Sequence, residues 1–287
     1  MIANITAPRS AGGKGMGGAK EAILAGCSAG GLGVYLHCDA FAGLLAGGLE
    51  YHATGGDGTA VTTPTRAVCL ADAGYFANIN SSFADMAGFA PHPIVNPEHS
   101  LIEYEYGWIF TEMAVGHGRS GGVASGCLGA LGRNSSLCFF PEHNLAYIKT
   151  PLYMLQSGYD QWHTRNIWFA TVKGQVTCTP AAAAQQVCGI EPGWGPCVQD
   201  VSTCNVTQKP YVIEKHAEFV ARLAPMLDPA IPHGGYVYSH SGHCASGGDV
   251  NGTSQARIAD WYDGTHLFDS KHVDPPVFTA DSTWDEA

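Results

Sequence analysis

Residues 22–45 of the 287-residue chain read AILAGCSAGGLGVYLHCDAFAGLL, and they give the clearest indication of its fold class. A short apolar run, AILA, ends at Gly26, and from Gly31 to Leu45 the large apolar residues recur at near-helical spacing. Between them, GCSAG matches G-x-S-x-G, the pattern of a nucleophile elbow, which is a tight turn from a strand into a helix. Glycines beside the serine let the backbone adopt the strained angles of that turn and hold the Ser28 hydroxyl above the sheet. We therefore expect a strand, a sharp turn and a helix, with Ser28 as the candidate nucleophile.

A second G-x-S-x-G match, GRSGG, occurs at residues 118–122. Its serine, Ser120, is followed by GGVASG, which is too rich in glycine to start a stable helix. Ser28 lies between an apolar run and an amphipathic segment, so Ser28 is the better candidate. The alternative for Ser28 is a helix N-cap after a glycine turn.

Three further segments have the composition of buried strands: AVCLA (67–71), PLYML (151–155) and GYVYS (235–239). Residues 210–227 form the clearest amphipathic helix. Alternating strands and helices predict an α/β fold with a mostly parallel sheet covered by helices on both faces. We expect one domain over residues 1–287, with a cysteine-rich insertion at about 170–208.

A nucleophilic serine needs a base and an orienting acid, and elbow enzymes carry them in the order Ser, Asp or Glu, His. Asp160 follows the strand PLYMLQSG, and Asp72 follows AVCLA, so both are candidates for the acid. Either aspartate could instead belong to a turn or cap. For the base, YSHSGHC (238–244) offers two histidines after a late strand. Gly242 permits a tight loop that returns His243 over the sheet, whereas His240, nearer the strand, is expected to pack or bond structurally.

The charge and motif content exclude several classes of function. The chain has 14 Lys and Arg against 25 Asp and Glu, a formal net charge of −11, which argues against nucleic acid or an anionic membrane as a partner. No run approaches the roughly 18 apolar residues of a transmembrane helix, so no membrane span is expected. No C-x-x-C, H-x-x-x-H or H-E-x-x-H pair occurs, and we expect neither a metal nor a cofactor.

Ten well-spread cysteines in a chain of low charge indicate an oxidising compartment. The pairs Cys127/Cys138 and Cys197/Cys204 flank turn sequences and could close short loops. Five N-x-S/T sequons fit a glycosylated exported protein: Asn4, Asn80, Asn134, Asn205 and Asn251. The chain shows no signal peptide at its start, yet secretion is the favoured localisation.

Four blocks of the sequence are distinctive when taken together: KGMGGAKEAILAGCSAGGLGVYLHCDAF (14–41), VCLADAGYF (68–76), LCFFPEHNLAYIKTPLYMLQSGYDQWHTRNI (137–167) and SGHCAS (241–246). They resemble the plant-type pectin acetylesterase family and, more distantly, the Notum carboxylesterases. The resemblance implies a secreted serine esterase with an α/β-hydrolase-like fold, with SGNH-like and flavodoxin-like variants as alternatives. Carried over by position, the nucleophile falls on Ser28, the acid on Asp160 and the base on His243, which leaves Asp72 a structural role.

The implied reaction removes acetyl groups from pectin through an acetyl-enzyme, with the backbone N–H of Ala29 as one oxyanion donor. Two alternatives remain open. One is a Notum-like carboxylesterase that acts on a lipid or other small acyl ester, which would need a long apolar pocket. The other is a non-catalytic remnant or glycan-binding pseudoenzyme.

The position of the elbow also carries an expectation. An elbow strand is expected to be central, but only 25 residues precede Gly26, and the glycine-rich GGKGMGG (12–18) lies too close to it to be the second oxyanion loop. We therefore expect an N-terminally incomplete chain that lacks upstream strands. Such a chain alone should be insoluble or molten, because an apolar parallel edge would be exposed.

Overall fold

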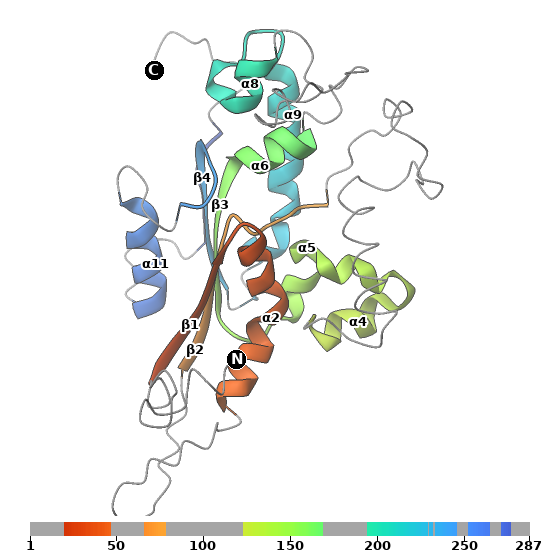
Figure 1. Cartoon of the computed structure of the whole chain (residues 1–287), viewed down its shortest axis with the longest axis vertical. Helices are drawn as coiled ribbons and strands as arrows, with labels where there is room; N and C mark the ends of the chain where they lie inside the picture. The colour runs from red at the N-terminus through yellow and green to blue at the C-terminus, as the bar shows by residue number, and fades with distance from the viewer. Residues whose placement is uncertain are drawn as a thin grey trace, which may run out of the picture.

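The computed structural model describes residues 20–46, 66–78, 123–168, 194–228, 230–231, 233–245, 252–264 and 271–276. These residues form one five-stranded sheet in the order β1-β2-β3-β4-β5, in which every neighbouring pair is parallel (Figure 1). The strands are β1 (Glu21–Cys27), β2 (Arg66–Asp72), β3 (Leu152–Asp160), β4 (Gly234–Gly242) and β5 (Lys271–Val273). The four predicted strands are confirmed, whereas β5 was not predicted.

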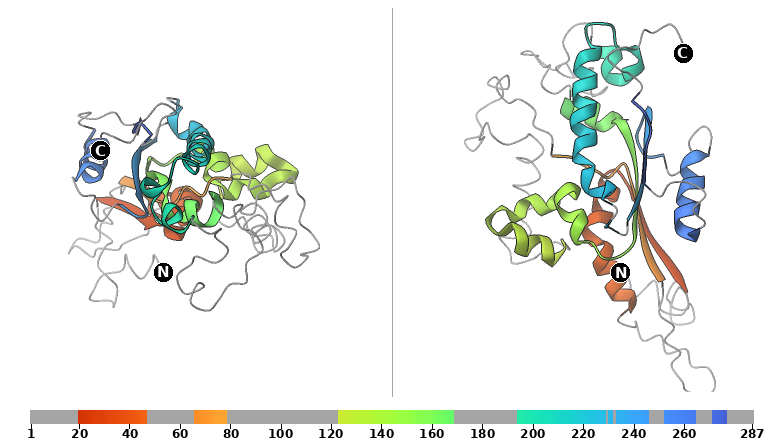
Figure 2. Two further views of the ribbon diagram at one scale, coloured as in Figure 1. Left: turned by 90° about the horizontal axis from the view of Figure 1, so that it is seen from above. Right: turned by 180° about the vertical axis from the view of Figure 1, so that it is seen from behind.

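Helices cover both faces of this sheet, which confirms the α/β class (Figure 1, Figure 2). Helices α2 and α9 lie on one face and α11 on the other, as the view from behind also shows (Figure 2). The helical segments are α2 (Ala29–Ala46), α4 (Ser125–Leu131), η5 (Gly132–Phe139), α5 (Pro141–Asn144), η6 (Leu145–Tyr147), α6 (Gln161–His163), η7 (Thr164–Trp168), α8 (Gly195–Gln199), η9 (Val201–Thr203), α9 (Lys209–Arg222), α10 (Ala224–Leu227) and α11 (Thr253–Asp263). None of these helices is both long enough and apolar enough to cross a membrane.

The helix predicted over residues 210–227 is two helices, so that expectation was wrong in its length. α9 ends at Arg222, and α10 begins at Ala224 with Pro225 in its first turn. Proline has no backbone N–H, and its ring clashes with the carbonyl four residues earlier, so α9 cannot continue through Pro225.

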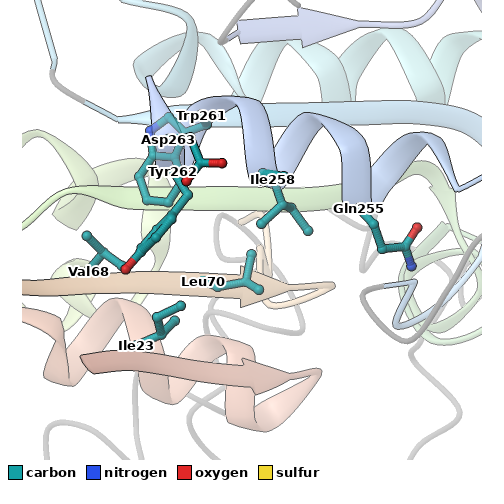
Figure 3. A pocket seen from close by; sticks show the side chains of 9 residues that line it. Ile23, Val68, Leu70, Gln255, Ile258, Trp261, Tyr262 and Asp263 are labelled. Atoms are coloured by element: carbon teal, nitrogen blue, oxygen red, sulfur yellow. The ribbon is translucent and has the colours of Figure 1, made fainter. Parts of the chain in front are cut away.

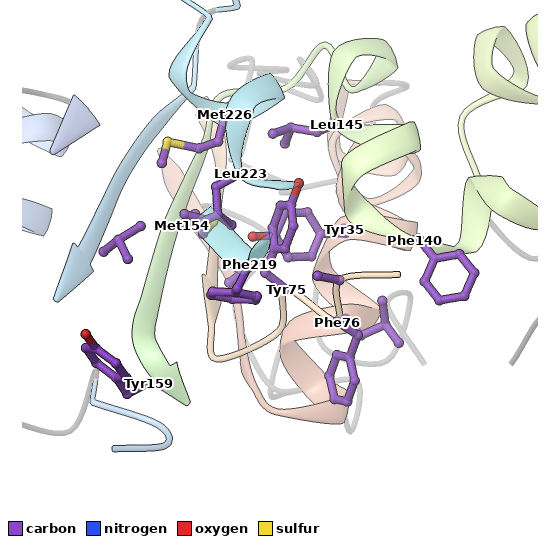
Figure 4. Packing of buried hydrophobic residues seen from close by; sticks show 14 of the residues in the cluster. Tyr35, Tyr75, Phe76, Phe140, Leu145, Met154, Tyr159, Phe219, Leu223 and Met226 are labelled. Carbon is purple, nitrogen blue, oxygen red and sulfur yellow. The ribbon is translucent and has the colours of Figure 1, made fainter. Parts of the chain in front are cut away.

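The main core lies between the sheet and the helices α2 and α9. Its large buried side chains come from strands, helices and the segments that join them: Tyr35, Tyr75, Phe76, Phe140, Leu145, Met154, Tyr159, Phe219, Leu223 and Met226 (Figure 4). A smaller cluster under α11 contains Tyr153, Leu155, Tyr236 and Tyr238. The two larger clusters thus lie on opposite faces of the sheet.

Strand β1, which leads into Ser28, lies at one edge of the described sheet. Ile23 in this strand is 52% exposed. Beside it, a cavity of about 330 Å³ opens between β1, β2 and α11, with Val68, Leu70 and Ile258 among its lining residues (Figure 3). The lining is mostly apolar.

The start of α2 packs backbone to backbone against the end of β2. A Cβ atom on Gly31 would lie 2.6 Å from the carbonyl oxygen of Asp72, and one on Gly74 would lie 2.3 Å from the carbonyl carbon of Gly31. Two glycines therefore let the helix after Ser28 approach the loop after β2, which brings the ends of β1 and β2 together.

Four disulfides join the described cysteines. The predicted pairs Cys127–Cys138 and Cys197–Cys204 are confirmed. Two further bonds were not predicted, Cys38–Cys69 and Cys27–Cys244. The remaining cysteines, at positions 178 and 188, lie outside the described residues, as does most of the predicted insertion at about 170–208. The single-domain assignment stays a prediction.

Candidate active site

Ser28 occupies the turn between β1 and α2. Its φ is 56°, in the left-handed region that non-glycine residues seldom adopt. Two backbone hydrogen bonds hold it there: the Ser28 N–H donates to the Asp72 carbonyl (2.9 Å), and the Leu32 N–H donates to the Ser28 carbonyl (2.9 Å). A Cβ atom on Gly26 would lie 2.3 Å from the Gly30 carbonyl oxygen, so the turn requires glycine at position 26. Strain of this kind persists only where the surrounding structure enforces it, and it is concentrated at functional sites.

Asp160 ends β3 and caps the short helix α6. Its side chain is 1% exposed. Oδ1 accepts hydrogen bonds from the backbone N–H groups of Trp162 (2.9 Å) and His163 (3.0 Å), and Oδ2 accepts one from the Gln156 side-chain amide (3.2 Å). This carboxylate is thus buried, and donors on several sides fix its orientation.

His243 follows β4 and contacts Asp160 directly. The register of the sheet pairs Asp160 with Gly242, the residue before His243. His243 Nδ1 lies 2.8 Å from Asp160 Oδ2, and the His243 side chain is 23% exposed. With Nδ1 turned toward the carboxylate, Nε2 is the ring nitrogen left to exchange a proton with another group.

Asp160 and His243 shift each other's pKa. Burial by itself would raise the pKa of Asp160, but the hydrogen bonds from His163 and His243 outweigh it and lower that pKa to about 2. The hydrogen bond to Asp160 raises the pKa of His243, and burial opposes this shift. The negative charge of Asp72 also raises the pKa of His243, whereas the positive charge of Arg165 lowers it.

Asp72, the other candidate acid, makes different contacts. It is 1% exposed, and its Oδ1 accepts a hydrogen bond from the Ala245 N–H at 3.1 Å. Its carbonyl oxygen accepts the Ser28 N–H described above. Asp72 therefore connects the turn at Ser28 with the segment that follows His243, while the imidazole of His243 contacts Asp160.

The four candidate residues thus lie at the carboxyl ends of four strands of the sheet. Ser28 follows β1, Asp72 ends β2, Asp160 ends β3 and His243 follows β4. Because all neighbouring strands are parallel, their carboxyl ends meet at the same edge, where open α/β sheets commonly bind ligands.

Comparison with known proteins identifies the family of this chain. Residues 10–259 match the family described as Pectinacetylesterase. The chain belongs to the pectinacetylesterase family. It is 26% identical over 260 residues to pectin acetylesterase 11 of Arabidopsis thaliana, and 27% identical over 282 residues to pectin acetylesterase 7 of the same plant. These alignments cover 87% and 94% of this chain but 53% and 58% of the relatives, so the chain spans little more than half of their length.

This pectinacetylesterase chain also aligns with a solved structure. The Wnt deacylase Notum from Drosophila aligns with 88% of this chain and 55% of its own, at 14% sequence identity and a TM-score of 0.48. That overlap is too limited to assign a function. The family resemblance drawn from the four sequence blocks is confirmed by the family match.

Gln156 and His163 also contact Asp160 in this pectinacetylesterase chain, and neither was predicted from the sequence. Gln156 lies four residues before Asp160 on the same strand; its amide oxygen accepts the Tyr75 N–H (3.1 Å) while its amide nitrogen donates to Asp160. The period of two along a strand could have indicated that Gln156 and Asp160 share a face.

His163 is the second missed residue, and it is 1% exposed. The Ala77 N–H donates to its Nε2 at 3.2 Å, and its Nδ1 lies 3.3 Å from Asp160 Oδ1. Because the backbone N–H of Ala77 can only donate, Nε2 of His163 carries the lone pair, and Nδ1 carries the hydrogen that points to Asp160. Gln156 and His163 thus anchor the carboxylate to the loop after β2.

Three other residues were singled out from the sequence: Ala29, His240 and Ser120. Ala29 is the first residue of α2, directly after Ser28, and first-turn N–H groups have no partner within their own helix. His240 is exposed, and its ring stacks on Tyr238 with centroids 4.3 Å apart, as expected of a packing histidine. Ser120 lies outside the described residues. Among the described residues, no group of three His, Cys, Asp or Glu side chains could hold a metal ion.

Proposed function

We propose that this protein is a serine carboxylic-ester hydrolase that removes acetyl groups from pectin, that is, from acetylated galacturonan. The observation that carries the proposal is the 2.8 Å contact between His243 Nδ1 and Asp160 Oδ2, at the sheet edge where Ser28 occupies a strained turn. Membership of the pectinacetylesterase family supports the choice of an acetyl ester of a pectic polysaccharide.

In the proposed reaction, His243 Nε2 takes the proton of the Ser28 hydroxyl as Ser28 Oγ attacks the acetyl carbonyl. Asp160 holds the imidazole in the tautomer with hydrogen on Nδ1 and stabilises the imidazolium that forms. His243 then protonates the departing sugar oxygen, which leaves an acetyl group on Ser28. Water, deprotonated by His243, attacks this acetyl-enzyme, and acetate leaves as Ser28 regains its proton.

The tetrahedral intermediate of each step carries a negative oxygen that needs hydrogen-bond donors. The backbone N–H of Ala29 is the proposed donor, since the residue after the nucleophile supplies one in elbow enzymes. Loss of one such donor typically costs on the order of 10²–10³ in turnover. No step of this mechanism calls on a metal or a cofactor.

Arg165 is the proposed contact for the carboxylates of a galacturonan chain. It lies five residues after Asp160, and its charge acts on His243. Its Nε is buried without a hydrogen-bond partner within the described structure, and a guanidinium pairs well with a carboxylate. A local cation of this kind offsets the repulsion between a polyanion and a protein of net charge −11.

The proposed location is the extracellular space or cell wall. Four disulfides among the described residues are typical of an oxidising compartment. Two of the predicted glycosylation sites, Asn134 and Asn205, are exposed, and the asparagines of the other three sequons lie outside the described residues.

Acetate release from acetylated pectin tests the proposal. Protein expressed from its full reading frame and purified should release acetate and should hydrolyse 4-nitrophenyl acetate, and it should leave 4-nitrophenyl palmitate nearly untouched. Strong preference for the palmitate ester would move the function to a lipid-type carboxylesterase. Binding of pectin without release of acetate from either substrate would indicate a pseudoenzyme.

A further inference from the structure

The disulfide Cys27–Cys244 joins the neighbours of two proposed catalytic residues. Cys27 directly precedes Ser28, and Cys244 directly follows His243, 217 positions away in the sequence. Their Cα atoms lie 5.6 Å apart. The candidate nucleophile and the candidate base are therefore one residue away, on each side, from the same covalent bond.

This bond connects strands that are not neighbours in the sheet. Cys27 ends β1 and Cys244 follows β4, while β2 and β3 lie between those strands. The segment after β4 must therefore pass back over the ends of β3 and β2 to reach β1. Sheet hydrogen bonds cannot hold that segment in place, because β1 and β4 share none.

Asp72, at the end of β2, makes a second connection along this path. Its carboxylate accepts the Ala245 N–H, one residue beyond Cys244, and its carbonyl accepts the Ser28 N–H, one residue beyond Cys27. A covalent bond and a buried carboxylate thus connect the same two segments. Of these two connections, a chemical reagent can selectively break the disulfide.

Solvent exposure distinguishes this disulfide from the other three in the described residues. Cys27 is exposed and Cys244 is half-buried. The six cysteines of the other described bonds are all buried: Cys38, Cys69, Cys127, Cys138, Cys197 and Cys204. Because thiol–disulfide exchange requires access of a thiolate to sulfur, Cys27–Cys244 should react first with a mild reductant.

We propose that the Cys27–Cys244 disulfide is a positioning element that holds His243 against Ser28, and that its reduction reversibly inactivates the enzyme. This inference rests on the proposed function. In the step, a small dithiol supplies two electrons and two protons: the Sγ–Sγ bond breaks, two cysteine thiols form, and the dithiol is oxidised to its cyclic disulfide. With the bond open, His243 keeps its contact with Asp160 but loses the covalent tie to the turn that carries Ser28.

The expected effect is on turnover rather than on binding. A misplacement of about 1 Å at a reacting pair can cost about 10² in rate. We therefore expect kcat for 4-nitrophenyl acetate to fall by about 10² in the reduced enzyme, with KM changed by less than about threefold. Removal of dithiol and reoxidation should restore kcat.

The experiment reduces the folded protein with dithiothreitol at graded concentrations and traps the thiols with iodoacetamide. Peptide mass spectrometry identifies the alkylated cysteines, and activity and circular dichroism are measured on the same samples. Loss of activity should follow alkylation of Cys27 and Cys244, while the dichroism spectrum stays that of the folded protein. Full activity in protein alkylated at both cysteines would overturn the proposal, and so would a loss of activity that appears only as the spectrum changes.

Paired variants provide the controls. Cys27→Ser with Cys244→Ser should reproduce the drop in kcat, whereas Cys127→Ser with Cys138→Ser, which opens a buried bond that flanks no proposed catalytic residue, should retain kcat. Equal kcat in the two double variants would contradict the inference. If the first double variant fails to fold, the reduction of wild-type protein decides the matter alone. Failure of the proposed function is recognised separately, because Ser28→Ala would then leave hydrolysis by the oxidised enzyme unchanged.

Discussion

His243 Nδ1 lies 2.8 Å from Asp160 Oδ2, although 83 residues of chain separate the two side chains. The contact exists because β3 and β4 are neighbouring parallel strands, so that residues at their carboxyl ends meet. Asp160 has a pKa of about 2 and is therefore ionised at neutral pH. An ionised carboxylate at this distance turns the imidazole so that Nε2 is the nitrogen left for proton transfer.

The first prediction concerns the nucleophile. Ser28→Ala should abolish acetate release from acetylated pectin, because no other hydroxyl occupies the strained turn after β1. Ser120→Ala, at the second G-x-S-x-G match, is the control and should leave the rate nearly unchanged. Loss of activity in the Ser120 variant alone would assign the nucleophile to that serine.

The second prediction concerns the acid. Asp160→Asn should lower kcat by about 10⁴, because an amide in place of the carboxylate favours the wrong tautomer of His243. Asp72→Asn should mainly lower thermal stability, since Asp72 contacts backbone groups. Steady-state kinetics and thermal melts of both variants check this, and the reverse pattern would make Asp72 the acid.

The strands and the elbow could be predicted from sequence because their signals are local. A four-residue apolar run, a glycine-flanked serine and an aspartate after a strand are each read within ten residues. Helix α11 and strand β5 were missed. The strand Lys271–Val273 is only three residues long, which is too short for a periodic signal.

Most contacts between residues far apart in the chain could not be predicted from the sequence. Which strands are neighbours, and how their loops fold back, determines the bond Cys27–Cys244 and the hydrogen bonds from the Tyr75 N–H to Gln156 and from the Ala77 N–H to His163. The Ala77 N–H that fixes the tautomer of His163 comes from a loop 86 residues away in sequence. Only Cys127–Cys138 and Cys197–Cys204, with separations of 11 and 7 residues, were short enough to predict.

The third prediction concerns pH. His243 must be neutral to act as base, and its pKa is raised, so activity should rise through a limb above the ordinary histidine pKa of about 6.5. Asp72→Asn removes a negative charge that raises this pKa, which should move the limb to lower pH. Arg165→Gln removes a positive charge that lowers it, which should move the limb to higher pH. Profiles of kcat/KM against pH check both shifts, and two shifts in one direction would contradict the electrostatic assignment.

The fourth prediction concerns the substrate. Arg165→Gln should raise KM for acetylated galacturonan about tenfold, as expected for loss of a charge-assisted pair of roughly 1.5 kcal/mol. KM for 4-nitrophenyl acetate, which has no carboxylate, should be unchanged at a pH where His243 is neutral in both proteins. Equal effects on the two substrates would remove Arg165 from the polysaccharide contact.

Covalent labelling tests whether Ser28 is a nucleophile that His243 activates. A fluorophosphonate probe is incubated with wild-type protein, with Ser28→Ala and with His243→Ala, and the labelled peptide is identified by mass spectrometry. The probe should attach to Ser28 in wild-type protein and to no residue in Ser28→Ala, and labelling of His243→Ala should be slower by orders of magnitude. Attachment to another serine, or labelling of Ser28 at the same rate without His243, would contradict the claim.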